Sequence, residues 1–209
     1  MINDYSVQNI EELISKITQQ GFAAIDDFLP ISTALGLAAE ISALNVSALL
    51  QDAGTGRLHQ MVNKNLRGDL IYWLNEADAT HAQRAYFTQM EILRLALNQA
   101  LYLGLFALES HLALYPAGAA YKKHIDRFKS INDGKPLRQI SAVLYLNPDW
   151  HDDDGGHLRL YMNGDSDSEY LDILPIGSRL VVFLSDTFYH EVLPASRDRM
   201  SLTAWFLTR

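Results

Sequence analysis

The 209-residue sequence contains no cysteine, which limits the chemistry available to it. Disulfide bonds and thiolate metal sites are excluded, so any metal site must use nitrogen and oxygen ligands. The sequence also lacks an apolar run long enough to span a membrane, and it begins with polar and acidic residues in place of a signal peptide. We therefore expect a cytoplasmic protein without a membrane partner.

Positive charge is also scarce, since 17 Lys and Arg residues stand against 25 Asp and Glu residues and the net charge is −8. Nucleic-acid binding depends largely on phosphate contacts from clustered basic side chains, and no basic stripe is present. We expect no nucleic-acid partner. Internal repeats and low-complexity segments are absent too, so residues 1–209 are predicted to form one domain.

Helical patterns are confined to the first half of the chain, where apolar residues recur at helical spacing in 7–20, 31–45 and 81–105. After Phe106 the pattern changes to short segments bounded by Gly, Pro, Asn and Asp. The predicted strands cover 107–116, 138–147, 156–162, 170–174, 179–184, 189–193 and 199–207. This succession predicts an α+β protein with a double-stranded β-helix core (a cupin-like jelly roll) in 106–209 and N-terminal supporting helices in 1–105.

A candidate metal site begins with His124-x-Asp126 and is completed by His190. Alternate side chains of a strand share a face, so one strand end can present both His124 and Asp126. Two imidazoles and one carboxylate form the facial arrangement that holds non-haem Fe(II) with open positions. His-x-Asp alone also arises by chance at solvated strand ends, so the third ligand matters.

A rival metal site would use His151 and His157, which flank the acidic run 152–154. The surrounding segment is typical of a solvated hairpin turn, and it lacks the closing Glu of a calcium loop.

The last predicted strand places Arg199, Ser201, Thr203 and Trp205 on one face, with apolar residues on the other. An arginine among interior side chains needs an anionic partner, because a buried guanidinium without one is costly. A dicarboxylate cosubstrate would supply that partner.

The combination of His124-x-Asp126, His190 and Arg199 with Arg67-Gly-Asp69 and Gly155-Gly-His-Leu-Arg resembles the Fe(II)- and 2-oxoglutarate-dependent oxygenases. Within them it is similar to prolyl 4-hydroxylases related to those acting on hypoxia-inducible factor. The resemblance implies that His124, Asp126 and His190 bind Fe(II), that 2-oxoglutarate and O2 are cosubstrates, and that L-ascorbate is a candidate reductant. It further implies polar contacts to 2-oxoglutarate from Arg199, Tyr145, Tyr115 and Thr203. It also implies apolar walls around 2-oxoglutarate from Val143, Leu158, Val192 and Trp205.

The same resemblance implies that Arg138 lies beside a substrate proline and that Arg67 and Asp69 orient a substrate loop at about 51–69. The expected reaction is hydroxylation of a prolyl residue in a protein or peptide, with succinate and CO2 as further products and elongation factor Tu as one candidate substrate. Three alternatives remain: a hydroxylase of a small molecule or free amino acid, a non-catalytic cupin-like sensor of metal and 2-oxoglutarate, and a structural jelly roll without metal. The oligomeric state does not follow from the sequence.

Overall fold

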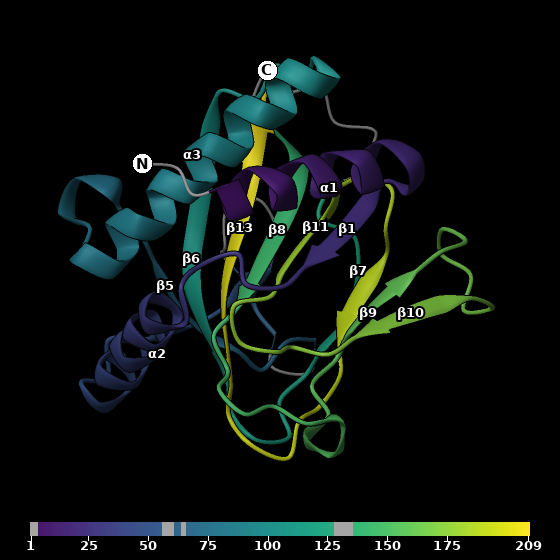
Figure 1. Ribbon diagram of the computed structural model, residues 1–209. Helices are drawn as coiled ribbons and strands as arrows, with labels where there is room; N and C mark the ends of the chain where they lie inside the picture. Colours follow the sequence, from purple (N-terminus) through teal and green to yellow (C-terminus); the bar gives the residue numbers. More distant parts are fainter. Residues whose placement is uncertain (1–3, 56–60, 64–65, 128–135) are drawn as a thin grey trace.

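The computed structural model describes residues 4–55, 61–63, 66–127 and 136–209. Antiparallel strands form a seven-stranded sheet in the order β1-β11-β8-β13-β6-β5-β2 and a four-stranded sheet in the order β10-β9-β12-β7 (Figure 1). The predicted double-stranded β-helix is thereby confirmed. The strands of the large sheet are β1 Phe22–Ile25, β2 Gln51–Asp52, β5 Leu70–Trp73, β6 Ala107–Tyr115, β8 Leu137–Tyr145, β11 Leu180–Leu184 and β13 Arg199–Thr208. Those of the small sheet are β7 Tyr121–His124, β9 Leu158–Tyr161, β10 Tyr170–Ile173 and β12 His190–Val192.

Three helices, α1 Asp4–Gln20, α2 Ile31–Val46 and α3 His81–Leu101, account for the helical patterns of the first half. A capping box between Thr80 and Gln83 begins α3. The prediction that this helix reaches residue 105 is wrong, because Tyr102 adopts a left-handed conformation with φ 53° and ends it. Within the described ranges, no helix has both the length and the apolar character needed to cross a membrane.

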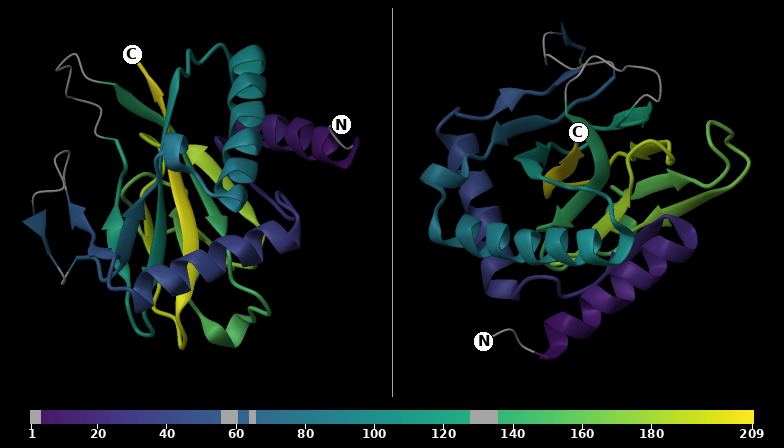
Figure 2. Two further views of the ribbon diagram at one scale, coloured as in Figure 1. Left: turned by 90° about the vertical axis from the view of Figure 1, so that its left-hand side faces the viewer. Right: turned by 90° about the horizontal axis from the view of Figure 1, so that it is seen from above.

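The side chains of β13 alternate between an apolar layer under the helices and the space between the two sheets. Leu202, Ala204 and Phe206 are buried together with residues of α1, α2 and α3, so the helices cover the outer face of the large sheet (Figure 2). A second cluster, which includes Val143, Leu158 and Val192, lies between the two sheets. The opposite face of β13 turns toward this inner space, where the candidate site is found.

Strand β7 is held on both edges. On one edge it pairs with β12, with His124 opposite His190 and Tyr121 opposite Val192. Three residue steps on β7 therefore match two on β12, which is a β-bulge. On the other edge, Lys122 N donates to Leu66 O at 2.9 Å and Gly68 N donates to Ala120 O at 3.0 Å.

The expected loop at 51–69 contains a short hairpin of β3 Gly54–Thr55 and β4 Met61–Val62. Residues 56–60 and 64–65 of that loop lie outside the described residues. Two single turns of 3-10 helix, η1 Glu76–Asp78 and η2 Asp152–Asp154, complete the elements.

Candidate functional site

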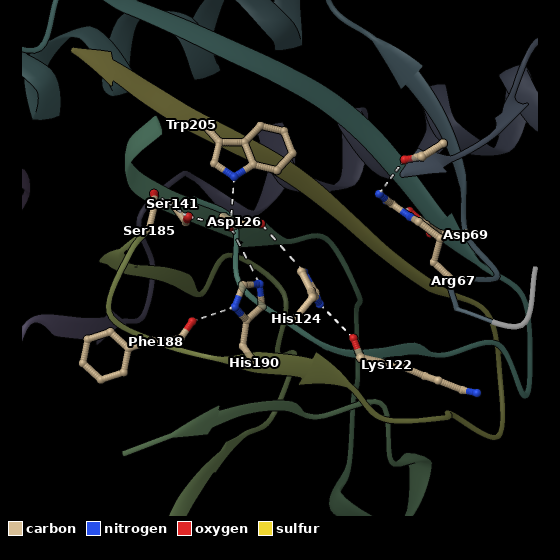
Figure 3. Close-up of polar contacts among 11 residues, drawn as sticks. Arg67, Asp69, Lys122, His124, Asp126, Ser141, Ser185, Phe188, His190 and Trp205 are labelled. Carbon is tan, nitrogen blue, oxygen red and sulfur yellow. Dashed lines mark hydrogen bonds and ion pairs between the residues drawn. The ribbon is translucent and has the colours of Figure 1, made fainter. Parts of the chain in front are cut away.

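His124, Asp126 and His190 converge on one point between the sheets, as Figure 3 shows. Their ligand atoms all lie within 4.8 Å of one another, and His124 Nε2 and His190 Nε2 are each 3.7 Å from a carboxylate oxygen of Asp126. Within the described ranges, this is the one group of three or more His, Cys, Asp or Glu side chains arranged to hold a metal ion. The predicted convergence is therefore present in the structure.

Both histidines are oriented in the same way. His124 Nδ1 donates to Lys122 O at 2.8 Å, and His190 Nδ1 donates to Phe188 O at 3.1 Å. Each carbonyl lies two residues before its histidine and can only accept, so Nδ1 carries the proton and Nε2 presents a lone pair. Figure 3 shows these two hydrogen bonds on the sides of the rings away from Asp126.

The protonation states suit a divalent cation. Burial, and then the neighbouring His190, lower the pKa of His124, so its imidazole is neutral at pH 7. Burial alone would raise the pKa of Asp126, but the two histidines, Arg138 and the hydrogen bond from Ser141 reverse this, and the net pKa lies below its ordinary value. A neutral imidazole beside an ionised carboxylate is the form that binds metal without first losing a proton.

One oxygen of Asp126 is already occupied. Ser141 Oγ donates to Asp126 Oδ2 at 2.6 Å, and Trp205 Nε1 donates to the same atom at 2.9 Å. Ser185 Oγ is 2.8 Å from Ser141 Oγ and extends the network. Asp126 Oδ1 is left facing His124, which makes it the oxygen available to a metal.

Trp205 differs from the prediction in one respect. It lines the cavity as an expected wall, but its indole N–H is directed at Asp126, so it serves the carboxylate as well. Ser141 and Ser185 were missed as site residues. Ser141 lies on β8 and Ser185 directly follows β11, so their contact depends on the pairing of these two strands and leaves no local signal.

A cavity of about 690 Å³ extends from this group between the sheets. Arg199 lies in it and is only 1% exposed, with Nε donating to Gly156 O at 2.9 Å. Its guanidinium carbon is 5.1 Å from the Tyr115 ring and 5.0 Å from the Tyr145 ring. The cavity is also lined by the predicted Val143, Leu158, Val192 and Thr203.

Two buried hydroxyls near Arg199 have no hydrogen-bond partner among the described residues. They are Tyr145 OH and Ser201 Oγ, which belong to residues that face each other across β8 and β13. Burial raises the pKa of Tyr145 to about 12, so this phenol remains a donor. Buried polar groups normally have partners, and two unpaired hydroxyls beside a buried guanidinium are suited to an anion. Ser201 was not predicted as a binding residue, although it shares the face of Arg199.

Arg138 lies in the more exposed part of the cavity. Its guanidinium carbon is 3.5 Å from the centre of the Trp205 ring, and Nη2 is 3.2 Å from Glu109 Oε2. His111 packs between this region and Trp73, with its ring centre 5.0 Å from the Trp73 ring. The predicted contact of Arg138 with a substrate stays a prediction.

Arg67 and Asp69 form a bidentate pair, with Arg67 Nε 2.7 Å from Asp69 Oδ1 and Nη2 2.5 Å from Oδ2. Arg67 Nη1 also donates to Gly54 O at 3.3 Å, which connects the pair to β3. Burial by itself lowers the pKa of Arg67, but its hydrogen bonds and charge contacts with Asp69 and nearby tyrosines raise the pKa above its ordinary value. Both residues lie at the C-terminal end of the predicted loop at about 51–69, and their contact with a substrate stays a prediction.

The rival acidic segment forms a surface turn. Asp152–Asp154 is η2, and His157 Nε2 is 3.0 Å from Asp152 Oδ1, an acid that is 88% exposed. No third ligand is grouped with them among the described residues.

The family model described as the 2OG-Fe(II) oxygenase superfamily matches residues 110–207. Among solved structures, a Pseudomonas putida prolyl-4-hydroxylase is 40% identical, with a TM-score of 0.83, 96% of this chain and 99% of that chain covered. A Trichoplax adhaerens prolyl hydroxylase in complex with a peptide fragment of the hypoxia inducible factor oxygen degradation domain is 28% identical, with a TM-score of 0.84. The latter alignment covers 98% of this chain and 93% of that chain.

Curated relatives include the human and rat proteins named Egl nine homolog 1, each 28% identical over 94% of this chain. The match covers 46% of the human protein and 58% of the rat protein, so the chain spans about half the length of these relatives.

Proposed function

Since the chain belongs to the 2OG-Fe(II) oxygenase superfamily as a prolyl hydroxylase-like, 2-oxoglutarate-dependent dioxygenase, we propose that it hydroxylates a prolyl residue of a protein substrate. The family implies Fe(II), 2-oxoglutarate and O2. The proposal assigns each of them, and the substrate, to particular side chains.

We assign Fe(II) to His124, Asp126 and His190. The donor set fits a facial site, because two Nε2 lone pairs and the free Oδ1 come from one side and leave the cavity side open. Bound Fe(II), with 2-oxoglutarate and O2, supplies the oxidising chemistry that hydroxylates a C–H bond and releases succinate and CO2. The protein's residues hold the ligands in register and keep Asp126 ionised.

We assign the distal carboxylate of 2-oxoglutarate to Arg199, Tyr145 and Ser201. The guanidinium is a planar fork suited to a carboxylate, and the two hydroxyls can donate the remaining hydrogen bonds. Thr203 lies one alternation further along β13, on the same face, and is placed to contact the middle of the molecule. The apolar walls exclude water from the site.

The substrate is assigned to the outer cavity, around Trp73, Arg138 and Trp205. A volume of about 690 Å³ accommodates a small dicarboxylate together with a further side chain. A prolyl ring is apolar and suits the aromatic surfaces there. The relatives named as prolyl hydroxylases support a protein substrate, and elongation factor Tu is the candidate we would test first.

The arrangement that carries the proposal is the buried Arg199, which lines the same cavity as the His-Asp-His group and has two buried, unpaired hydroxyls near it. The test combines the protein with Fe(II), 2-oxoglutarate and ascorbate, with and without prolyl peptides, and measures succinate and peptide mass. We expect succinate formation that increases with peptide, and the gain of one oxygen atom on proline.

His124→Ala should abolish turnover, and Arg199→Met should raise the KM for 2-oxoglutarate by at least about tenfold, since a charged hydrogen-bonded pair is lost. If prolyl peptides left succinate formation unchanged and a small molecule increased it, that compound and not a protein would be the substrate. A parent protein that binds metal and 2-oxoglutarate without forming succinate would be a sensor.

A further inference from the structure

The ring of Tyr121 is stacked on the ring of His124. Their centres are 3.6 Å apart and their planes differ by 14°. A contact this close covers one face of the imidazole and fixes the plane in which it lies. Neither the metal assignment nor the 2-oxoglutarate assignment above uses Tyr121.

The stack depends on the bulge in β7. Residues three apart in a regular strand point to opposite faces, so Tyr121 and His124 would normally be separated by the backbone. The extra residue between Tyr121 and His124, relative to β12, changes that parity and turns both rings into the same cavity.

The other face of Tyr121 is covered by Arg67, whose guanidinium carbon is 4.3 Å from the ring centre. His124 already occupies one face at 3.6 Å, so Arg67 must lie on the opposite face. Asp69 lies beside Arg67 (Figure 3) and accepts two hydrogen bonds from it. Asp69 itself is 2% exposed. Asp69, Arg67, Tyr121 and His124 thus form a continuous column, which we call the Arg67–Tyr121 column.

The backbone fixes the start of this column. Arg67 and Tyr121 are directly opposite each other in a β-bridge, so their side chains lie on the same face. Gly68 allows the close approach, because a Cβ there would lie 3.2 Å from the Cβ of Ala119. Gly68, the glycine of Arg-Gly-Asp, therefore allows Arg67 to pack against β7.

We propose that Tyr121 is a positioning residue for His124, and that the Arg67–Asp69 pair acts through Tyr121 on the metal site. The proposal rests on the assignment of His124 as an Fe(II) ligand. It gives Arg67 and Asp69 a role that does not require contact with substrate.

Two constraints together determine where His124 Nε2 points. The hydrogen bond from Nδ1 to Lys122 O sets the direction of the ring, and the stack sets its plane. His190 has a comparable pair of constraints, from Phe188 O and from Phe183, whose ring packs edge-on with its centre 4.8 Å away. Removing the stack leaves the His124 ring with its hydrogen bond and a tilted contact with the His190 ring, whose centre is 4.1 Å away. The plane of the ring is then less restricted, so more entropy is lost when metal binds.

The experiment compares Tyr121→Leu and Tyr121→Phe with the parent. Affinity for Co(II) is measured by calorimetry, and the charge-transfer absorption of the Fe(II)–2-oxoglutarate chelate is recorded without oxygen. Tyr121→Leu should bind Co(II) about tenfold more weakly, the lower end of the effect of outer partners on metal sites, and should shift the absorption band. Tyr121→Phe keeps the stack and should recover both properties.

A matched control exists on β9 and β10, where Arg159 lies 3.8 Å from the ring centre of Tyr170 and forms two 2.7 Å hydrogen bonds to Asp172. This triple has the same composition, and the ring that packs against Tyr170 among the described residues belongs to Tyr161 and not to a histidine. Tyr170→Leu should leave the metal affinity and the absorption band unchanged.

A second route avoids dependence on one variant. Arg67→Met with Asp69→Asn removes the cation without leaving a buried carboxylate unpaired, and should weaken Co(II) binding in the same direction. Parent-like affinity and absorption in both Tyr121→Leu and this double variant would overturn the proposal. A parent protein without Co(II) affinity or chelate absorption would instead refute the metal assignment itself.

Discussion

At the scale of single residues, Ser141 on β8 and Ser201 on β13 belong to two different parts of the site, one around Asp126 and the other around Arg199. Ser141 donates to Asp126 Oδ2, the carboxylate oxygen that is not assigned to the metal, whereas Ser201 lies unpaired near Arg199. Both are 1% exposed, so their substitution by alanine removes a similar buried hydroxyl.

We therefore expect Ser141→Ala to affect metal binding and Ser201→Ala to affect the KM for 2-oxoglutarate. The first should weaken Co(II) binding by about tenfold, because Asp126 loses an outer hydrogen bond. The second should raise the KM for 2-oxoglutarate several-fold, roughly the loss of one hydrogen bond of about 1 kcal/mol, and leave Co(II) binding unchanged. Calorimetry and succinate assays on both proteins check this. If both variants weakened Co(II) binding equally, the different roles of the two serines would be contradicted.

His111 gives the protein a pH-dependent stability. It is 2% exposed, and burial lowers its pKa to about 4. The folded state then binds fewer protons than the unfolded state between about pH 6.5 and pH 4. The contribution of neutral His111 to the free energy of unfolding is therefore fully present above about pH 6.5. This free energy falls as the pH drops toward 4, by roughly 3 kcal/mol in total.

Comparison with His111→Phe isolates this contribution, since the other titrating groups are common to both proteins. Denaturant unfolding of the metal-free proteins between pH 7 and pH 4 should show a steeper decline for the parent. Parallel declines would mean that His111 is protonated in the folded state with little cost.

At the scale of elements, the turn that precedes β9 supports Arg199 directly. Gly156 has φ +70°, and a Cβ there would lie 3.0 Å from Ala195 Cβ and 3.2 Å from Arg199 Cδ. Its carbonyl also accepts the hydrogen bond from Arg199 Nε. Conformation and space both require glycine at this position.

Gly156→Ala should destabilise the fold by roughly 2 to 3 kcal/mol and raise the KM for 2-oxoglutarate. Gly164 is the control, since it has φ +59° but nothing within 4 Å of an added Cβ. Gly164→Ala should cost only the backbone strain of about 1 kcal/mol and leave the KM unchanged. Thermal unfolding and succinate kinetics of the pair separate strain from displacement of Arg199. If Gly156→Ala had a parent-like KM, its effect on Arg199 would be refuted.

Elements were predicted well where a local pattern existed. Alternation in 199–207 gave the two faces of β13, and both faces are found as expected. The end of α3 was missed because Tyr102 carries no signal for a left-handed conformation, which glycine would have provided. The stack of Tyr121 on His124 was invisible for a related reason: sequence spacing assigns the two rings to opposite faces, and the bulge that reverses this depends on pairing with β12.

At the scale of the whole molecule, the convergence of His124, Asp126 and His190 followed from a resemblance of motifs, and the structure brings them together. The network of Ser141, Ser185 and Trp205 could not be predicted in this way. Ser141 lies on β8, Ser185 directly follows β11 and Trp205 lies on β13, so their contacts follow from the pairing of β8 with β11 and β13.

The two faces of the large sheet have different roles. The outer face of the large sheet is apolar and packs on three helices, while the inner face combines apolar residues with the polar and charged side chains of the site. A sheet with both faces covered can keep its folding core on one side and vary the other.

The segment 66–68 along the outer edge of β7 also has a consequence for behaviour in solution. A short strand beside an open cavity is normally a template on which a strand from another molecule can add and start aggregation. Here the amide of Lys122 and the carbonyl of Ala120 are already engaged within the same chain. This part of the β7 edge is therefore not available to pair with a strand from another molecule, although it lies next to the cavity.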